Sequence, residues 1–105
     1  MVKQKFIKSR KVYQLTFEVP PSELPAPEVK SLVVAGSFNG WSHSSHPFKQ
    51  TKSGLFKATV ELASPGLHHY RYLLNEKMWV NDWHAESYER NDHGEDNCIV
   101  NVREA

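Results

Sequence analysis

The sequence lacks several features that would indicate a secreted or membrane protein. Its 105 residues include one cysteine, Cys98, so no internal disulfide can form, and a lone thiol fits a reducing compartment. No apolar run approaches the length of a membrane span. The basic start, Met1–Lys5, is not followed by the apolar segment and cleavage site of a signal peptide. We therefore expect a soluble cytoplasmic protein.

An excess of charge of one sign is also missing. The 13 Lys and Arg residues face 12 Asp and Glu residues, which leaves a net charge of +1 with neutral histidines. Binding to nucleic acid or to a membrane surface usually needs concentrated positive charge, so neither partner is expected. The length suffices for one domain with a modest hydrophobic core.

Helical periodicity is absent as well, and apolar residues alternate with polar ones instead. Every second side chain of Val12–Val19 is apolar, which is the period of a half-buried strand. Leu32–Ala35 is a largely β-branched run between breakers, typical of a strand buried on both faces. The predicted strands are Val12–Val19, Leu32–Ala35, Phe56–Leu62, His68–Asn75, Met78–Val80 and Asn97–Val102. Six or seven short strands predict an all-β fold, an antiparallel β-sandwich of immunoglobulin type.

The segments between these strands are expected to carry little regular structure. Lys3–Lys11 is basic and predicted to be weakly structured, and Asn81–Asp96 is predicted to be a polar, irregular loop. Pro20–Glu28 contains four prolines and is expected to form an extended linker that cannot pair in a sheet. We therefore expect a single domain, in which residues 1–28 form an N-terminal extension packed on the module of residues 30–102.

The last predicted strand also indicates the state of the lone thiol. Cys98 shares a strand face with Val100 and Val102. A free cysteine behaves as a small hydrophobic residue, so Cys98 is expected to be buried and reduced.

Three tryptophans, Trp41, Trp79 and Trp83, stand beside polar loops rather than within long apolar runs. Trp41 follows the turn Gly36–Gly40, whose Asn-Gly pair suits a positive φ. Taken alone, Trp41 would be read as a cap on the sandwich, but clustered exposed aromatic residues usually mark a binding surface. Sugars suit such a surface, because the C–H face of a pyranose lies flat on an indole while its hydroxyls reach polar side chains.

Two polar residues are candidates for those hydroxyl contacts. Arg71 lies on the strand face opposite Tyr70 and Tyr72, and its planar fork of donors can bridge neighbouring sugar hydroxyls. Asn97 offers a donor and an acceptor together. The structural alternatives are a solvated or ion-paired strand residue for Arg71 and a turn residue for Asn97, and residue type by itself favours these alternatives.

Three segments together resemble carbohydrate-binding module family 48: VVAGSFNGW, GLHHYRYLLNEKMWVND and NDHGEDNCIV. This isoamylase N-terminal-like family includes the glycogen-binding domain of the AMP-activated kinase β subunit, and the similarity spans Lys30–Val102. The resemblance implies an immunoglobulin-like sandwich of the early-set type. It also implies a non-catalytic module, without a cofactor, that binds α-1,4-glucans such as glycogen, starch and maltooligosaccharides. The carbohydrate-binding residues that it implies are Trp41, Arg71, Trp79, His93, Glu95 and Asn97.

The sequence departs from the family's pattern at three places. The turn Asn75–Met78 before Trp79 lacks the usual Asp-Gly pair. Trp83 stands where a proline is common, and it either adds a third stacking surface or packs the loop. His93 and Glu95 replace an apolar residue and a threonine, so the apolar contact with the glucan is expected to be weaker or replaced by hydrogen bonds.

Catalysis and metal binding are less favoured alternatives. Glycosidases need two carboxylates across a cleft, whereas the six in Asn81–Asp96 share one loop and are expected to solvate it and cap its turns. Catalytic relatives carry their activity on a separate barrel, for which this chain is too short. His68 and His69 point to opposite faces of a strand, and the pair of His43 and His46 lacks a cysteine partner, so no metal site is expected.

A protein-interaction module is the alternative that we keep open beside glucan binding. Immunoglobulin-like folds host many functions, so the fold does not decide between the two. In the family that the chain resembles, the domain commonly docks on an attached or partner enzyme. A glycan-metabolising enzyme or a kinase complex is therefore the alternative partner.

Overall fold

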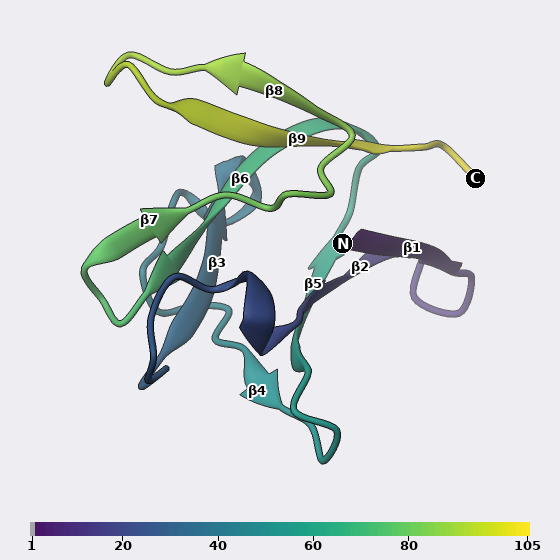
Figure 1. Ribbon diagram of the computed structural model, residues 1–105. Coiled ribbons are helices and arrows are strands. Elements are labelled where there is room, and N and C mark those ends of the chain that lie inside the picture. The colour runs from purple at the N-terminus through teal and green to yellow at the C-terminus, as the bar shows by residue number, and fades with distance from the viewer. Residues whose placement is uncertain (1) are drawn as a thin grey trace.

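Two antiparallel sheets pack face to face in the computed structural model, which describes residues 2–105 (Figure 1). The first sheet has the order β1-β2-β5-β4, with strands β1 (Val2–Ile7), β2 (Val12–Val19), β5 (Phe56–Leu62) and β4 (Lys49–Gln50). The second has the order β3-β6-β9-β8, with β3 (Leu32–Gly36), β6 (Gly66–Leu74), β9 (Asp96–Val102) and β8 (Ser87–Arg90). A short strand, β7 (Met78–Val80), also pairs with β6. The all-β sandwich predicted from the sequence is confirmed.

The alternation of side chains along the strands creates the core between the sheets. In β5 the four apolar residues are buried, and the three polar residues between them are exposed. The two sheets meet through aromatic rings: the centroid of Phe17 in β2 lies 5.1 Å from that of Tyr70 and 6.4 Å from that of Tyr72, both in β6. Cys98 is fully buried in the same cluster, as its position in the last strand predicted.

The central strand β6 divides one of its edges between two partners. Its first half, residues 66–70, pairs with β9, and residues 72–74 pair with β7. The opposite edge pairs with β3, where Arg71 faces Ala35. Arg71 therefore lies where β9 ends its pairing and β7 begins. The two strands β7 and β9 are labelled beside β6 in Figure 1.

Two predicted loop segments contain strands that the sequence pattern does not reveal. Lys3–Lys11 was predicted to be weakly structured, but β1 pairs with β2 along six residues. Asn81–Asp96 was predicted to be irregular, but it includes β8, which pairs with β9. All four residues of β8 are exposed, so this edge strand has no apolar alternation and depends on backbone pairing. The two-residue strand β4 was also not predicted.

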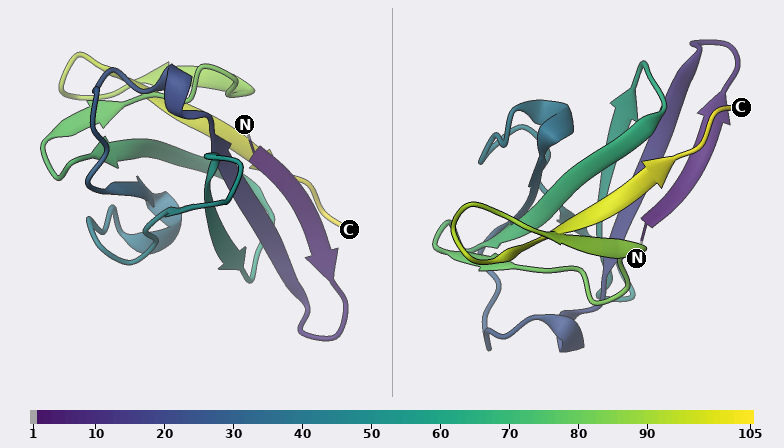
Figure 2. Two further views of the ribbon diagram at one scale, coloured as in Figure 1. Left: turned by 60° about the horizontal axis from the view of Figure 1, so that its bottom comes forward. Right: turned by 90° about the horizontal axis from the view of Figure 1, so that it is seen from above.

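The proline-rich segment lies against the sandwich rather than away from it. It contains a one-turn 3₁₀ helix, η1 (Pro21–Glu23), drawn as a short dark blue coil in Figure 2. The side chain of Leu24, directly after this helix, is buried. Asn75 in the β6–β7 turn ties down the end of this segment, because its Oδ1 accepts from Lys30 N at 2.7 Å and its Nδ2 donates to Glu28 O at 3.0 Å. Within residues 2–105, no helix is long and apolar enough to cross a membrane.

Gly36 ends β3 in a place that leaves no room for a side chain. A Cβ atom there would lie 2.4 Å from the backbone oxygen of His69 and 2.8 Å from the ring of Phe38. We expect Gly36→Ala to lower the free energy of unfolding by about 3 kcal/mol, because the clash is with backbone and forces the strands apart. Gly40→Ala is the comparison: nothing lies within 4 Å of its Cβ, and its φ of 64° costs only about 1 kcal/mol. Urea unfolding measures both, and wild-type stability of Gly36→Ala would contradict this packing.

The thiol of Cys98 is both inaccessible and hard to ionise. Burial raises its pKa to about 11, and the thiolate is the form that reacts. We expect a thiol reagent at pH 8 to label Cys98 in the native protein orders of magnitude more slowly than in urea. Equal rates in the two conditions would show that β9 does not hold the side chain in the core.

Candidate functional site

The pairing of the second sheet places three predicted site residues on its outer face. Leu73 pairs with Trp79, so Trp79 projects from the same face as Leu73 and Arg71, which are two residues apart in β6. Tyr70 pairs with Cys98 on the core face, so the neighbouring Asn97 projects outward. Residues from β6, β7 and β9 are therefore combined on one surface because each strand alternates in the same register.

Trp41 reaches this surface through a tightly bonded turn after β3. The 3₁₀ helix η2 (Ser37–Asn39) is followed by two residues in the left-handed region, Gly40 with φ 64° and Trp41 with φ 58°. The Trp41 backbone N–H donates to Gly36 O at 2.8 Å. Asn39 holds the turn from within, since its Oδ1 accepts from Gly36 N at 3.0 Å and from Ser42 N at 3.2 Å. The turn was predicted, whereas the positive φ of Trp41 was not.

Trp41 and Trp79 form an aromatic pair whose rings are strongly inclined. Their centroids are 6.5 Å apart and their planes make an angle of 74°. His43, from the loop after Trp41, packs on Trp79 with a centroid distance of 5.4 Å. The guanidinium carbon of Arg71 lies 6.0 Å from the centre of the Trp79 ring, within the range of a cation–π contact. Trp79 is thus positioned by contacts with neighbouring side chains.

Arg71 is less accessible than the sequence predicted. It was expected on an outward, solvent-facing surface, but only 8% of the residue is exposed. Its Nε donates to Asn81 Oδ1 at 2.7 Å, and its Nη1 donates to Glu95 Oε1 at 2.6 Å. Arg71 does lie on the outer face of β6, opposite Tyr70 and Tyr72. It is buried there because Trp79 and the β8–β9 turn cover that face. The guanidinium of Arg71 is therefore held in place, and its Nε and Nη1 atoms already donate hydrogen bonds within the protein.

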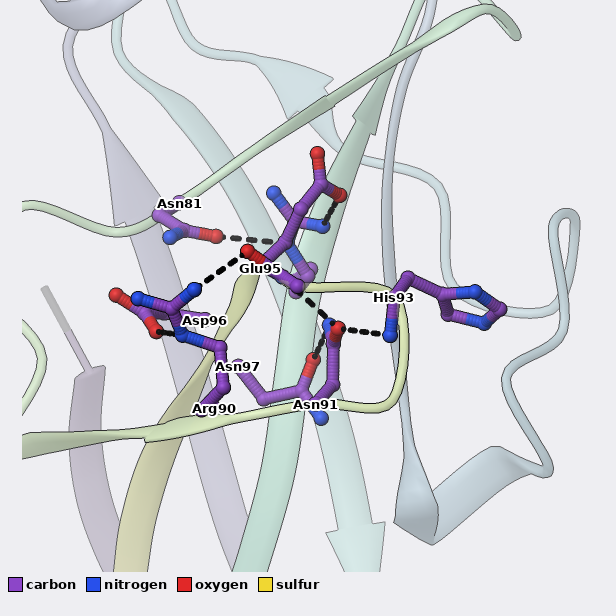
Figure 3. Close-up of polar contacts among 9 residues, drawn as sticks. Asn81, Arg90, Asn91, His93, Glu95, Asp96 and Asn97 are labelled. Carbon is purple, nitrogen blue, oxygen red and sulfur yellow. Dashed lines mark hydrogen bonds and ion pairs between the residues drawn. The ribbon is translucent and has the colours of Figure 1, made fainter.

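The turn between β8 and β9 is organised by Asn91, whose role the sequence analysis missed. Its Oδ1 accepts from the backbone N–H groups of His93 at 2.9 Å and Glu95 at 3.1 Å, and its Nδ2 donates to Asn97 Oδ1 at 3.1 Å (Figure 3). The ring of His93 extends away from this network, while Glu95 lies within it (Figure 3). Asn-Asp-x-Gly is turn chemistry, so the sequence Asn91–Gly94 carried the signal.

These elements enclose one open groove of about 520 Å³. All six residues predicted to bind carbohydrate line it, and they are joined by two that were not predicted. The lining residues are Trp41, Arg71, Trp79, Asn91, Asp92, His93, Glu95 and Asn97. The structure thus brings together residues from four separate parts of the chain. The supporting residues Asn81 and His43 were also missed, and no sequence signal marked them.

Trp83 does not line this groove. It lies in the segment between β7 and β8 and is 69% exposed. The neighbouring Asp82 was expected to solvate that loop, but it is only 2% exposed. Burial raises its pKa, yet hydrogen bonds from His84 N and from the Tyr70 hydroxyl oppose this, and the net pKa is lowered. Asp82 is therefore a structural carboxylate that ties the segment to the core.

The groove combines apolar aromatic faces with charged and amide groups. That combination suits a neutral, hydroxyl-rich ligand with C–H faces. Among the described residues, no group of three or more His, Cys, Asp or Glu side chains is arranged to hold a metal ion.

Comparison with known proteins agrees with this chemistry. No curated protein matches the chain. A family model described as the glycogen recognition site of AMP-activated protein kinase matches residues 27–105, most of the chain, which confirms the resemblance predicted from the sequence. The matched region contains β3 to β9 and every residue that lines the groove. The chain therefore belongs to the family of carbohydrate-binding modules that contains this glycogen recognition site.

Proposed function

We propose that the groove binds α-1,4-glucans such as glycogen, starch and maltooligosaccharides by stacking glucose units on Trp41 and Trp79. The observation that carries the proposal is the inclined pair of indoles, 6.5 Å apart at 74°, set in a groove with polar walls. Membership in a glycogen recognition family supports carbohydrate as the ligand class.

The angle between the indoles supports a curved chain over a flat one. An α-1,4-linked glucan bends at each linkage, so consecutive glucose faces can meet two surfaces that are inclined to each other. A β-1,4-linked chain is extended and flat, and it would lie well on only one of the two rings. The proposed selectivity therefore follows from the relative orientation of Trp41 and Trp79.

The polar residues of the groove are positioned to contact the sugar hydroxyls. Asn97 uses its Oδ1 to accept from Asn91, which leaves its amide N–H groups for a ligand. Glu95 is largely exposed and accepts from Arg71 with one oxygen, so its other oxygen can accept from a hydroxyl. His93 is exposed at the rim of the groove. We assign the polar contacts to Arg71, His93, Glu95 and Asn97.

The proposed role is binding without catalysis. Glycoside hydrolysis needs two carboxyl groups on opposite sides of the bond, one of them protonated. The two carboxylates of the groove, Asp92 and Glu95, come from the same short turn, and Glu95 is ion-paired with Arg71. This arrangement suits hydrogen bonding to a sugar better than proton transfer to a glycosidic oxygen.

We expect Trp41→Ala and Trp79→Ala each to weaken maltoheptaose binding by about 1–3 kcal/mol, by analogy with other stacking aromatic residues. Both residues lie on the outer face and are only partly buried, so each truncation should cost well below the ~3–5 kcal/mol of stability that a core aromatic residue would cost. Titration of the intact protein with maltoheptaose and cellohexaose, read by tryptophan fluorescence, is the first measurement. Leu67→Ala, which removes an exposed apolar side chain away from the groove, is the matched control. If maltoheptaose does not change the tryptophan fluorescence of the intact protein, the proposal of glucan binding is wrong, and a protein-interaction module is favoured.

Arg71→Ala is expected to weaken glucan binding by about 1–3 kcal/mol and to lower stability by a similar amount, because its hydrogen bonds involve a charged group. The stability falls because Arg71 is buried and its removal leaves the Oδ1 atom of Asn81 without its hydrogen-bond donor. Glu95→Gln keeps the shape and an acceptor but removes the charge, so it should cost less in stability. Calorimetric titration together with urea unfolding separates the two effects. A destabilised Arg71→Ala that binds maltoheptaose with unchanged Kd would remove Arg71 from the ligand contacts.

A further inference from the structure

A second hollow, of about 430 Å³, adjoins the proposed glucan groove and shares Arg71 and Trp79 with it. Its remaining wall includes Trp83, Met78, Glu23 and Asn81. Trp83 is 69% exposed and Met78 46% exposed, so both leave large apolar side chains open to solvent. A single exposed apolar residue is ordinary, but two beside one hollow form a patch of the kind that binds a ligand.

The backbone around Trp83 is held rigidly by the residues on either side of it. Asp82 N donates to Cys98 Sγ at 3.2 Å, and the Tyr88 hydroxyl donates to Asp82 O at 2.6 Å. After Trp83, His84 N donates to Asp82 Oδ1 at 2.9 Å. The backbone of this segment is already ordered, so it loses little backbone freedom when Trp83 meets a ligand, and this geometry suits a binding platform.

Polar groups stand beside this indole in the arrangement that sugars require. Arg71 Nε donates to Asn81 Oδ1, which orients the amide. No hydrogen bond within residues 2–105 uses the two N–H donors of Asn81. Glu23 Oε2 contacts His84 Nε2 at 3.0 Å, which fixes a carboxylate at the other side of the hollow. An indole face, amide donors and a carboxylate acceptor together match the C–H face and hydroxyls of a glucosyl unit.

We propose that this second hollow binds a further part of the same α-glucan, with Trp83 as its stacking surface. The proposal rests on the proposed function, because the two sites share one occupant. A chain bound at Trp41 and Trp79 leaves the first groove across Trp79 and Arg71, and those two residues are also the border of the second hollow. A short oligosaccharide occupies the first groove alone, whereas a longer one reaches Trp83.

Dependence on chain length tests this proposal. Calorimetric titration of the intact protein and of Trp83→Ala with maltotriose and with maltoheptaose gives four values of Kd. We expect Trp83→Ala to bind maltoheptaose about tenfold more weakly, the loss typical of one stacking contact, and to leave maltotriose binding unchanged. Trp83→Phe should restore part of the lost affinity for maltoheptaose. Leu67→Ala removes another largely exposed apolar side chain, outside both hollows, and should change neither value.

The remaining outcomes contradict the proposal in distinguishable ways. If Trp83→Ala leaves both values unchanged, the second hollow does not bind the glucan, while the first groove stands. If Trp83→Ala weakens both sugars equally, Trp83 acts on the first groove and there is no extended site. If the intact protein binds neither sugar, the proposed function fails and this inference fails with it.

Discussion

The alternation of side chains along β6 is the constraint on which the rest of the structure depends. This strand pairs with β3, β7 and β9, so its register decides which residues of all three face the core. Tyr70 and Tyr72 project inward and contact the opposite sheet, while Arg71 projects outward between them. A slip of one residue would exchange the two faces. The same pairing therefore builds the core and assembles the groove.

Two asparagines hold the loops that border the groove. Asn39 accepts two backbone N–H groups in the turn before Trp41, and Asn91 does the same in the turn that carries His93 and Glu95. Each satisfies donors that the strands cannot reach, so the loops are ordered without a hydrophobic core of their own. A site ordered before the ligand arrives loses less entropy on binding, which supports a role for both loops in affinity as well as folding.

Asp82 connects the outer surface to the core through a buried carboxylate. It accepts from the Tyr70 hydroxyl at 2.8 Å, and its backbone groups bond to Cys98 and Tyr88. A buried charge is tolerated only when it is bonded in this way. The consequence is that the segment carrying Trp83 follows the geometry of the core, although the indole itself lies in solvent. Core packing and the second hollow, which Asn81 and Trp83 line, are thus connected through Asp82.

The sequence by itself determined the fold class, the inward and outward faces of the strands with clear alternation, and the burial of Cys98, because alternation and turn residues act over short distances in the chain. The six candidate site residues came instead from the resemblance to a known family, since residue type alone favoured structural roles for Arg71 and Asn97. The edge strands β1 and β8 remained hidden, since their partners, not their own apolar residues, decide that they pair. Only the tertiary structure decided that Arg71 is buried between Asn81 and Glu95 and that Trp83 borders a separate hollow. Each of these depends on residues that are distant in sequence, and contacts of that kind leave no periodic signal.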